Sequence, residues 1–227
     1  LGKETSRQNI PNLFAYKQKR IFGYKPLSKE EAFRGEVGLP RVLNMYENYP
    51  FWATFFRELG FRTVLSPVSS HKLYEMGIES IPSESECYPA KLAHGHVQWL
   101  VEQGVKTIFH PCVFYEKQET PAAQNHFNCP IVVSCPENLK NNVEAVADGD
   151  VRYIRPFMAF TSEKIAADKL VSECRKEWNI PEPEVRMAVK AAWAEQQQAK
   201  ADVRAAGQAA LFIINIPKFH DCALLMI

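Results

Sequence analysis

The 227-residue sequence predicts an α/β fold in which a mostly parallel sheet carries helices on both faces, as in flavodoxin- and Rossmann-like proteins, plus a C-terminal helical extension. Between residues 34 and 146, short segments rich in β-branched and aromatic residues alternate with segments of helical periodicity. After residue 150 the composition changes, and long helical sequence rich in Ala, Gln and Lys follows. We therefore divide the chain into an N-terminal arm or linker (1–33), an α/β domain (34–147) and a mainly helical extension (148–227).

The α/β domain opens with a strand–helix–strand unit. The segment Glu36 to Leu39 predicts a buried strand, and the aromatic and aliphatic residues of Val42 to Leu59 approximate a helical stripe. Pro50 predicts a kink or a new turn in this helix, and Gly60 suits its C-terminal end. Phe61 to Leu65 is short and β-branched, as expected of the second strand. About thirty residues of this pattern indicate a βαβ unit.

The rest of the domain continues the alternation of strand and helix. The predicted elements are a helix at His71 to Met76, a helix from Pro89 to about Gly104, a strand at Val105 to Phe109, a strand at Pro130 to Ser134 and a helix from Pro136 to Val146. A polar loop, Glu116 to Asn128, separates the last two strands. Such an alternation favours a parallel sheet, in which the carboxyl ends of all strands meet at one edge.

The flanking regions are mainly helical. In the arm we expect a short helix around Asn12 to Ile21. In the extension, Arg152 to Phe160 predicts an edge strand broken by Pro156, and Thr161 caps a helix that runs to Trp178. Glu184 to Ala209 predicts one long helix whose weak apolar face needs a partner. A hydrophobic tail, 211–227, follows.

Composition excludes several classes of function. The net charge of +1 gives no reason to expect nucleic acid or an anionic membrane as a partner. The longest apolar run, Ala209 to Ile216, is too short to span a bilayer, and no secretory signal opens the chain. The sequence lacks G-x-G-x-x-G, G-x-x-x-x-G-K-[ST] and G-x-S-x-G motifs. Because the first residue is not Met, we expect an excised part of a longer protein.

Six cysteines are unevenly distributed, with four of them between Cys87 and Cys135. Without a signal peptide we expect the reducing cytoplasm, where clustered cysteines indicate metal binding or catalysis more often than disulfides. Cys87 precedes a helix, whose dipole favours the thiolate that a metal, an iron–sulfur cluster or nucleophilic chemistry requires. Cys112 follows His110-Pro111 at a strand end, where its side chain can face a cleft.

Cys135 has an equivalent place, between the strand at 130–134 and the following helix. Cys129 precedes that strand, about 20 Å from Cys135 at the rise of a β-strand. Geometry therefore favours Cys135 over Cys129 as a partner of Cys112. The alternative is that all four thiols only pack as small hydrophobes, since no C-x-x-C pair is present.

Other polar residues near the same edge are candidates for anion binding. Arg41 follows the first strand, so it is a candidate anion ligand, with a structural salt bridge as the alternative. Lys91 lies one helical turn after Cys87 and could place positive charge near an anionic ligand or cluster, or remain solvated. His94 and His96 are two residues apart on a helix and cannot chelate one ion together. We expect one in a hydrogen bond and the other in solvent.

Four segments together resemble one family. They are R-G-E-V-G-L-P-R-V-L-N-M-Y-E-N-Y-P-F-W (34–52), S-E-C-Y-P-A-K-L-A-H-G-H (85–96), H-P-C-V-F-Y-E (110–116) and N-C-P-I-V (128–132). Over about residues 10–205 the chain resembles the uncharacterised module of the acyl-CoA dehydratase activase-related proteins, the CoA-substrate-specific enzyme activases. It is distantly similar to the cluster-binding subunits of 2-hydroxyacyl-CoA dehydratases and to double-cubane-cluster reductases. From residue 210 onward we expect no further resemblance.

The resemblance implies a cytoplasmic iron–sulfur electron-transfer module in anaerobic metabolism. Its partners would be an ATPase domain of the same longer polypeptide or a dehydratase or reductase, and its substrates would be CoA thioesters. Cys87 and Cys112 match the family's cysteine positions best, and the family favours a cysteine at Cys129, whereas our geometry favours Cys135. Two alternatives stay open: a non-catalytic docking or regulatory domain whose cysteines only pack, and an acyl-CoA or small-molecule binding domain that uses Arg41 and Lys91.

Overall fold

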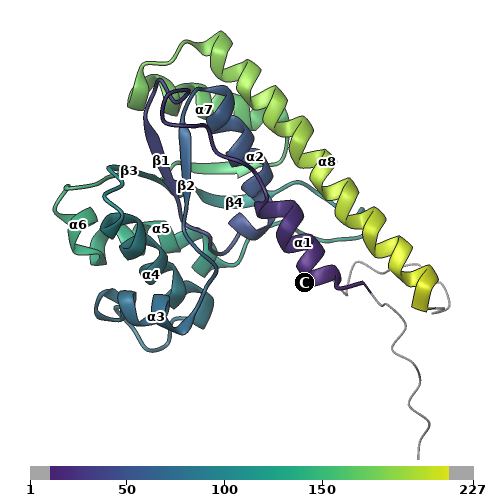
Figure 1. Ribbon diagram of the computed structural model, residues 1–227, viewed down its shortest axis with the longest axis horizontal. Helices are drawn as coiled ribbons and strands as arrows, with labels where there is room; N and C mark the ends of the chain where they lie inside the picture. The colour runs from purple at the N-terminus through teal and green to yellow at the C-terminus, as the bar shows by residue number, and fades with distance from the viewer. Residues whose placement is uncertain (1–10, 215–227) are drawn as a thin grey trace, which may run out of the picture.

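The computed structural model describes residues 11–214 (Figure 1). Its helices are α1 (Leu13–Phe22), α2 (Met45–Glu58), α3 (His71–Gly77), α4 (Tyr88–Glu102), α5 (Pro130–Asn142), α6 (Glu144–Ala147), α7 (Glu163–Trp178) and α8 (Glu182–Ile214), with a 3-10 turn, η1 (Ile78–Ser80), after α3. Its strands are β1 (Glu36–Leu39), β2 (Arg62–Leu65), β3 (Thr107–Phe109), β4 (Cys112–Glu116), β5 (Arg152–Ile154) and β6 (Phe157–Phe160). The hydrophobic tail of the sequence lies mostly outside these residues.

A four-stranded parallel sheet in the order β2-β1-β3-β5 organises the fold. This is the strand order of flavodoxin-like proteins, in which the chain reverses direction across the sheet between β1 and β3. The prediction of an α/β fold with a mostly parallel sheet is confirmed. The carboxyl ends of all four strands lie at one edge, so the segments that follow them are brought together there.

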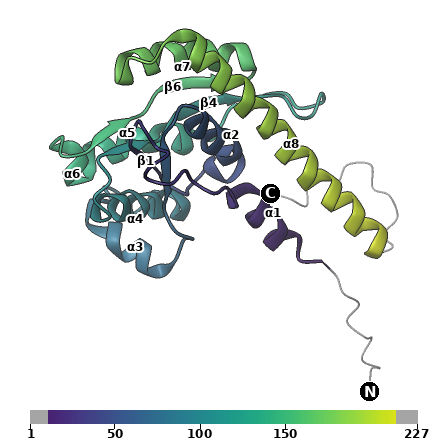
Figure 2. The ribbon, with the colours of Figure 1, turned by 45° about the horizontal axis from the view of Figure 1, so that its top comes forward.

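Helices cover both faces of the sheet, as predicted. Successive strand residues point to opposite sides, so each strand contributes side chains to both layers. Phe109 and Ile154 belong to a core that α2, α7 and α8 complete. Their neighbours Ile108 and Tyr153 belong to a second core under α4 and α5. Figure 2 shows these two helical layers on either side of the strands. The first core is mainly aromatic, and α2 contributes five fully buried rings to it: Tyr49, Phe51, Trp52, Phe55 and Phe56.

Two strands continue through proline into a second, smaller sheet. After β3 the chain passes His110-Pro111 and becomes β4, and after β5 it passes Arg155-Pro156 and becomes β6. β4 and β6 pair in parallel, so the two neighbours stay side by side through both bends. Proline cannot donate to a ladder hydrogen bond, and both bends fall at these residues. The prediction of a strand broken at Pro156 is confirmed, whereas β4 was not predicted.

The predicted strand at Pro130 to Ser134 is wrong, because these residues form the first turns of α5. Pro130 takes the first helical position, where its missing N–H is not needed. The buried residues Cys135 and Leu139 are four apart, which is helical spacing. The predicted helix at 42–59 begins later, at Met45, because Leu43 has the left-handed φ of 49° and turns the chain first.

α3 lies directly against α4 through two glycines. A Cβ atom added to Gly95 would lie 1.6 Å from the carbonyl oxygen of Leu73, and one added to Gly77 would lie 2.2 Å from the backbone nitrogen of Gly95. Only glycine permits this approach of two backbones. The contact places the 3-10 turn after α3 beside the middle of α4.

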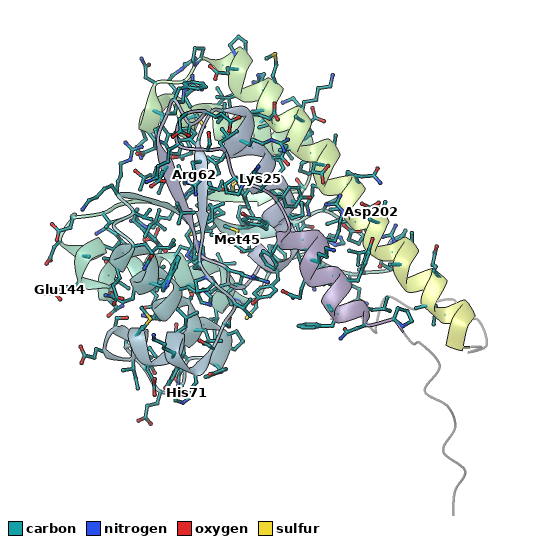
Figure 3. All side chains as sticks on the ribbon, viewed as in Figure 1. Lys25, Met45, Arg62, His71, Glu144 and Asp202 are labelled. Carbon is teal, nitrogen blue, oxygen red and sulfur yellow. The ribbon has the colours of Figure 1, made fainter. Side chains whose placement is uncertain are left out.

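The long helix α8 was predicted and spans 33 residues, or about 50 Å. Its apolar face packs on α2, and α1 of the predicted arm lies alongside it (Figure 1). Arg20 of α1 pairs with Glu195 at 2.8 Å and with Asp202 at 2.7 Å, and Figure 3 labels Asp202 on this part of α8. The partner that the weak apolar face of this helix requires is therefore the α/β domain itself.

Candidate functional site at the carboxyl edge of the sheet

The four cysteines predicted as metal ligands occupy two kinds of environment. Cys87 and Cys129 are exposed N-cap residues, of α4 and α5 respectively. Cys112 begins β4 and Cys135 lies in the second turn of α5, and both are buried. The predicted position of Cys87 at a helix N-terminus is confirmed.

Cys112 does not turn into a cleft as predicted. The chain continues as β4, and the backbone nitrogen of Cys112 donates to the carbonyl oxygen of Pro156 at 2.9 Å. Its thiol is 1% exposed and makes a weak contact of 3.9 Å with the carbonyl oxygen of Arg155. Burial raises the pKa of Cys112 to about 11, so the thiol keeps its proton at neutral pH in the absence of a ligand.

Two of the other cysteines and one carboxylate lie near Cys135. Burial raises the pKa of Cys135, and the charges of Glu86, Cys112 and Cys87 raise it further, so each of these groups lies near Cys135. The structure therefore brings Cys87, Cys112 and Cys135 together from three different elements. Within residues 11–214, however, no three His, Cys, Asp or Glu side chains are already arranged to hold a metal ion.

Cys129 has a different relation to Cys135 from the one predicted. Both lie at or in one helix, so six residues separate them by about 9 Å rather than 20 Å. Six helical steps also turn the chain by about 600°, so the two side chains leave α5 on different faces. Cys129 is not among the groups whose charges raise the pKa of Cys135.

Glu86, which sequence reasoning did not assign to the site, lies between α4 and α5. Its Oε1 accepts a hydrogen bond of 2.7 Å from Nδ2 of Asn138, and its Oε2 lies 3.5 Å from Nε2 of His94. Cys135 and Asn138 are three residues apart on α5 and so share a face of that helix. Burial lowers the pKa of His94, and the charge of Glu86 opposes this shift.

The expectation that one histidine of α4 faces solvent is wrong, since His94 and His96 are both fully buried. His96 contacts the hydroxyl of Ser66 through Nδ1 at 2.7 Å and that of Ser69 through Nε2 at 3.0 Å. The Ser66 hydroxyl also accepts from the backbone nitrogen of Arg41. Burial lowers the pKa of His96 to about 4, so the imidazole is neutral at pH 7.

His110 lies at the first proline bend and pairs with a tyrosine of the neighbouring strand. Its Nδ1 is 2.8 Å from the hydroxyl of Tyr153. Both side chains are buried under α4 and α5, and burial lowers the pKa of His110 to about 3. Burial likewise raises the pKa of Tyr153, and the charges of Cys135 and Cys112 raise it further. The neutral pair therefore borders the cysteines on the sheet side.

The two predicted anion ligands lie at the same edge with partners of their own. Arg41 stacks on the ring of Phe22, 3.8 Å from its centroid, and donates to the side chain of Gln18 at 2.7 Å. Its Nε is buried without a hydrogen-bond acceptor. Lys91 donates to the carbonyl oxygen of Glu84 at 2.8 Å, which ties the segment before Cys87 to α4.

A surface hollow of about 370 Å³ lies apart from these residues. It lies between α3 and the C-terminal half of α4, where Leu73, Met76 and Trp99 contribute to its wall. None of the six predicted site residues lines it. Across residues 11–214, the longest apolar helical stretch falls short of what a membrane span requires.

Comparison with known families shows the family of this chain. The family model described as the CoA enzyme activase uncharacterised domain matches residues 36–224. The chain belongs to this family. The predicted resemblance to the activase-related module is thereby confirmed. The expectation that it ends before residue 210 is wrong, since the match to this activase-family domain continues to residue 224. No curated protein and no solved structure matches the sequence.

Proposed function

We propose that this activase-family domain is the electron-transfer module of an ATP-driven activase or reductase system acting on CoA thioesters. Its iron–sulfur cluster would be held by Cys87, Cys112 and Cys135. The observation that carries this proposal is the convergence of these three thiols from α4, β4 and α5 at the carboxyl edge of the sheet. Ligands of open α/β sheets bind at this edge.

The residues present fit the needs of such a cluster in two respects. Thiolates ligate iron, and the burial of Cys112 and Cys135 supplies the low-dielectric surroundings that help to set a reduction potential. When bound, the cluster would supply one-electron chemistry. Because burial raises the pKa values of both thiols, they are protonated without a ligand, and ligation must release those protons. Loading is therefore expected to be favoured by higher pH.

The partners in this proposal follow from the family. An ATPase domain of the same longer polypeptide, or a dehydratase or reductase, would exchange electrons with the module in the cytoplasm. Cys87 is exposed, so one edge of a cluster that it holds would lie near the surface, where a redox partner could approach.

The test is the content of iron and acid-labile sulfide after anaerobic reconstitution of the 227-residue chain. Cys87→Ser should lose iron and sulfide, because it removes a ligand. Cys129→Ser is the matched control: it changes the exposed N-cap of the other helix, and it should load like wild type. Wild-type protein without iron, or a Cys87→Ser variant that loads normally, would contradict the proposal.

A second candidate, binding of an acyl-CoA or another anion, is favoured by unsatisfied donors after β1. Nε of Arg41 and Nδ2 of Asn44 are both buried without acceptors, within the turn that precedes α2. Buried donors normally have partners, and a phosphate or carboxylate would supply them. A CoA thioester should then raise the melting temperature of wild type but not of Arg41→Met, with the exposed Arg57→Met as control. Equal shifts in wild type and Arg41→Met would exclude this site.

A further inference from the structure

The hydrogen bonds around His94 determine which of its ring nitrogens carries a proton when the ring is neutral. The Ser80 hydroxyl donates to the carbonyl oxygen of Gly77 at 2.9 Å, which uses its single proton. At 2.8 Å from Nδ1 of His94, the same hydroxyl must therefore accept a hydrogen bond from Nδ1–H. The lone pair of the neutral ring is consequently on Nε2.

Nε2 lies close to a second buried acceptor that has no hydrogen-bond partner. Nε2 of His94 lies 3.5 Å from Oε2 of Glu86, and both atoms are buried without a hydrogen-bond partner. The His94 side chain is fully buried, and that of Glu86 is 9% exposed. Two buried acceptors that face one another are unfavourable unless a proton or a metal cation lies between them.

The groups behind this pair hold both donor atoms in place. Ser80 fixes the ring of His94 from the Nδ1 side, and Asn138 fixes Glu86 through Oε1 at 2.7 Å. Metal-binding histidines commonly donate their second ring N–H to an oxygen in this way, and ligating carboxylates are themselves hydrogen-bonded. The orientation of Oε2 and Nε2 is thus determined before any ion is present.

Two of the cysteines lie near Glu86. Glu86 directly precedes Cys87, and its charge acts on Cys135, which lies one turn before Asn138 on α5. We propose that Glu86 and His94 are additional ligands of the metal centre that the cysteines form. This inference rests on the proposed function, and it extends the thiolate ligand set with one carboxylate oxygen and one imidazole nitrogen.

Metal binding by matched variants of the full 227-residue chain tests the inference. The pair is removed by Glu86→Gln and by His94→Gln. The controls are Glu75→Gln and His71→Gln, which remove the exposed histidine–glutamate pair of α3, 3.2 Å apart. Each protein is reconstituted with iron and sulfide, and in a separate experiment titrated with Co²⁺ alone. We expect both Glu86→Gln and His94→Gln to bind at least ~10-fold more weakly, while the controls bind like wild type.

The outcomes separate the two proposals. If wild type loads iron and sulfide and both site variants load equally with unchanged spectra, the pair holds only a proton and the inference fails, whereas the proposed function stands. If wild type binds Co²⁺ in a pair-dependent manner but no iron and sulfide, the inference stands and the proposed function fails. If wild type binds neither, both are overturned.

A measurement on wild type alone guards against variants that fail to fold. Pulsed electron paramagnetic resonance of the loaded, reduced wild-type protein should show coupling to an imidazole nitrogen. Histidine is a known ligand of iron in some clusters and raises their potential. Absence of that coupling would exclude His94 as a ligand regardless of how the variants behave.

Discussion

Substitution of Gly95 by Ala should destabilise the protein, although alanine is the better helix former. The new Cβ would lie 1.6 Å from the carbonyl oxygen of Leu73, whereas real Cβ contacts are essentially never under 3.0 Å, so α3 must move by at least the difference of 1.4 Å. Overpacking costs about 1–3 kcal/mol, and losing the burial of Leu73 costs about 2 kcal/mol more. The higher helix propensity of alanine relative to glycine offsets about 1 kcal/mol of this loss of stability. The net loss is about 2–4 kcal/mol, which lowers the melting temperature by roughly 4–16 °C.

Chemical and thermal denaturation of Gly95→Ala and Gly104→Ala measure this effect. Gly104 follows α4 with φ of +77° and open space around it, so Gly104→Ala adds backbone strain of about 1 kcal/mol without a clash. Gly95→Ala should therefore be the less stable variant. If Glu86 and His94 bind a metal as proposed, it should also weaken that binding, because the 3-10 turn that carries Ser80 moves with α3. A Gly95→Ala protein as stable as wild type would refute the close packing of α3 on α4.

Further predictions concern thiol access, pH and the docking of α8. Brief treatment of the folded protein with iodoacetamide, read by mass spectrometry, should modify two of the five cysteines in residues 11–214, Cys87 and Cys129, and spare the buried Cys112, Cys135 and Cys174; modification of Cys112 before unfolding would contradict its position in β4. The pKa values of His96 and His110, about 4 and about 3, lie below the ordinary 6.5, so the unfolded chain binds protons more readily and stability is lost as pH falls from 6.5 toward 4. His96 alone should account for roughly 3 kcal/mol of this loss, and His96→Gln should flatten the urea-denaturation profile over that range, with an unchanged slope contradicting the assignment. Arg20→Ala should cost about 1–2 kcal/mol in urea denaturation because it breaks the half-buried pairs with Glu195 and Asp202, whereas the exposed Arg57→Ala should cost almost nothing.

Much of the fold follows from local patterns in the sequence. β1 has the predicted bounds, and the helix from Pro89 to about Gly104 is α4 with Cys87 as its N-cap. These elements carry local signals, namely a short segment bounded by Gly35 and Pro40 for β1, and an amphipathic stripe opened by proline and closed by glycine for α4. Signals of this kind depend on neighbouring residues only, so they are available without the structure.

The errors arise where a short apolar run fits either a strand or a helix. Pro130 to Ser134 contains three β-branched residues in a row, yet tertiary packing selects a helix that buries Cys135 and Leu139. Conversely, Cys112 to Glu116 continues a strand across a proline that local pattern takes as its end. Periodicity cannot assign apolar runs of this length to strand or helix. The pairing with β6 makes 112–116 a strand, and the packing of one face of α5 makes 130–134 a helix.

Prediction of the candidate site from sequence has the same limit. That Cys87 and Cys112 lie at one edge follows from the topology of parallel sheets, and it was predicted. The approach of Glu86 to His94 and Asn138 was not, because it depends on the distance between α4 and α5. The sequence holds one usable signal in hindsight: Asn138 follows Cys135 by three residues, and Glu86 adjoins Cys87, so each cysteine has a polar neighbour on its own face or turn.

The parallel pairing of β3 with β5 has a consequence for the timing of assembly. The site draws on residues from Glu86 to Arg155, and β3 lacks its neighbour on that side until β5 and β6 have been made. At 5–20 residues per second, the 75 residues from Glu86 to Phe160 take roughly 4–15 s to synthesise. Throughout that interval the thiols of the nascent chain are neither gathered nor shielded. In the proposed function, insertion of the cluster would therefore follow completion of the second sheet, and oxidation of the early cysteines would be the competing event during synthesis.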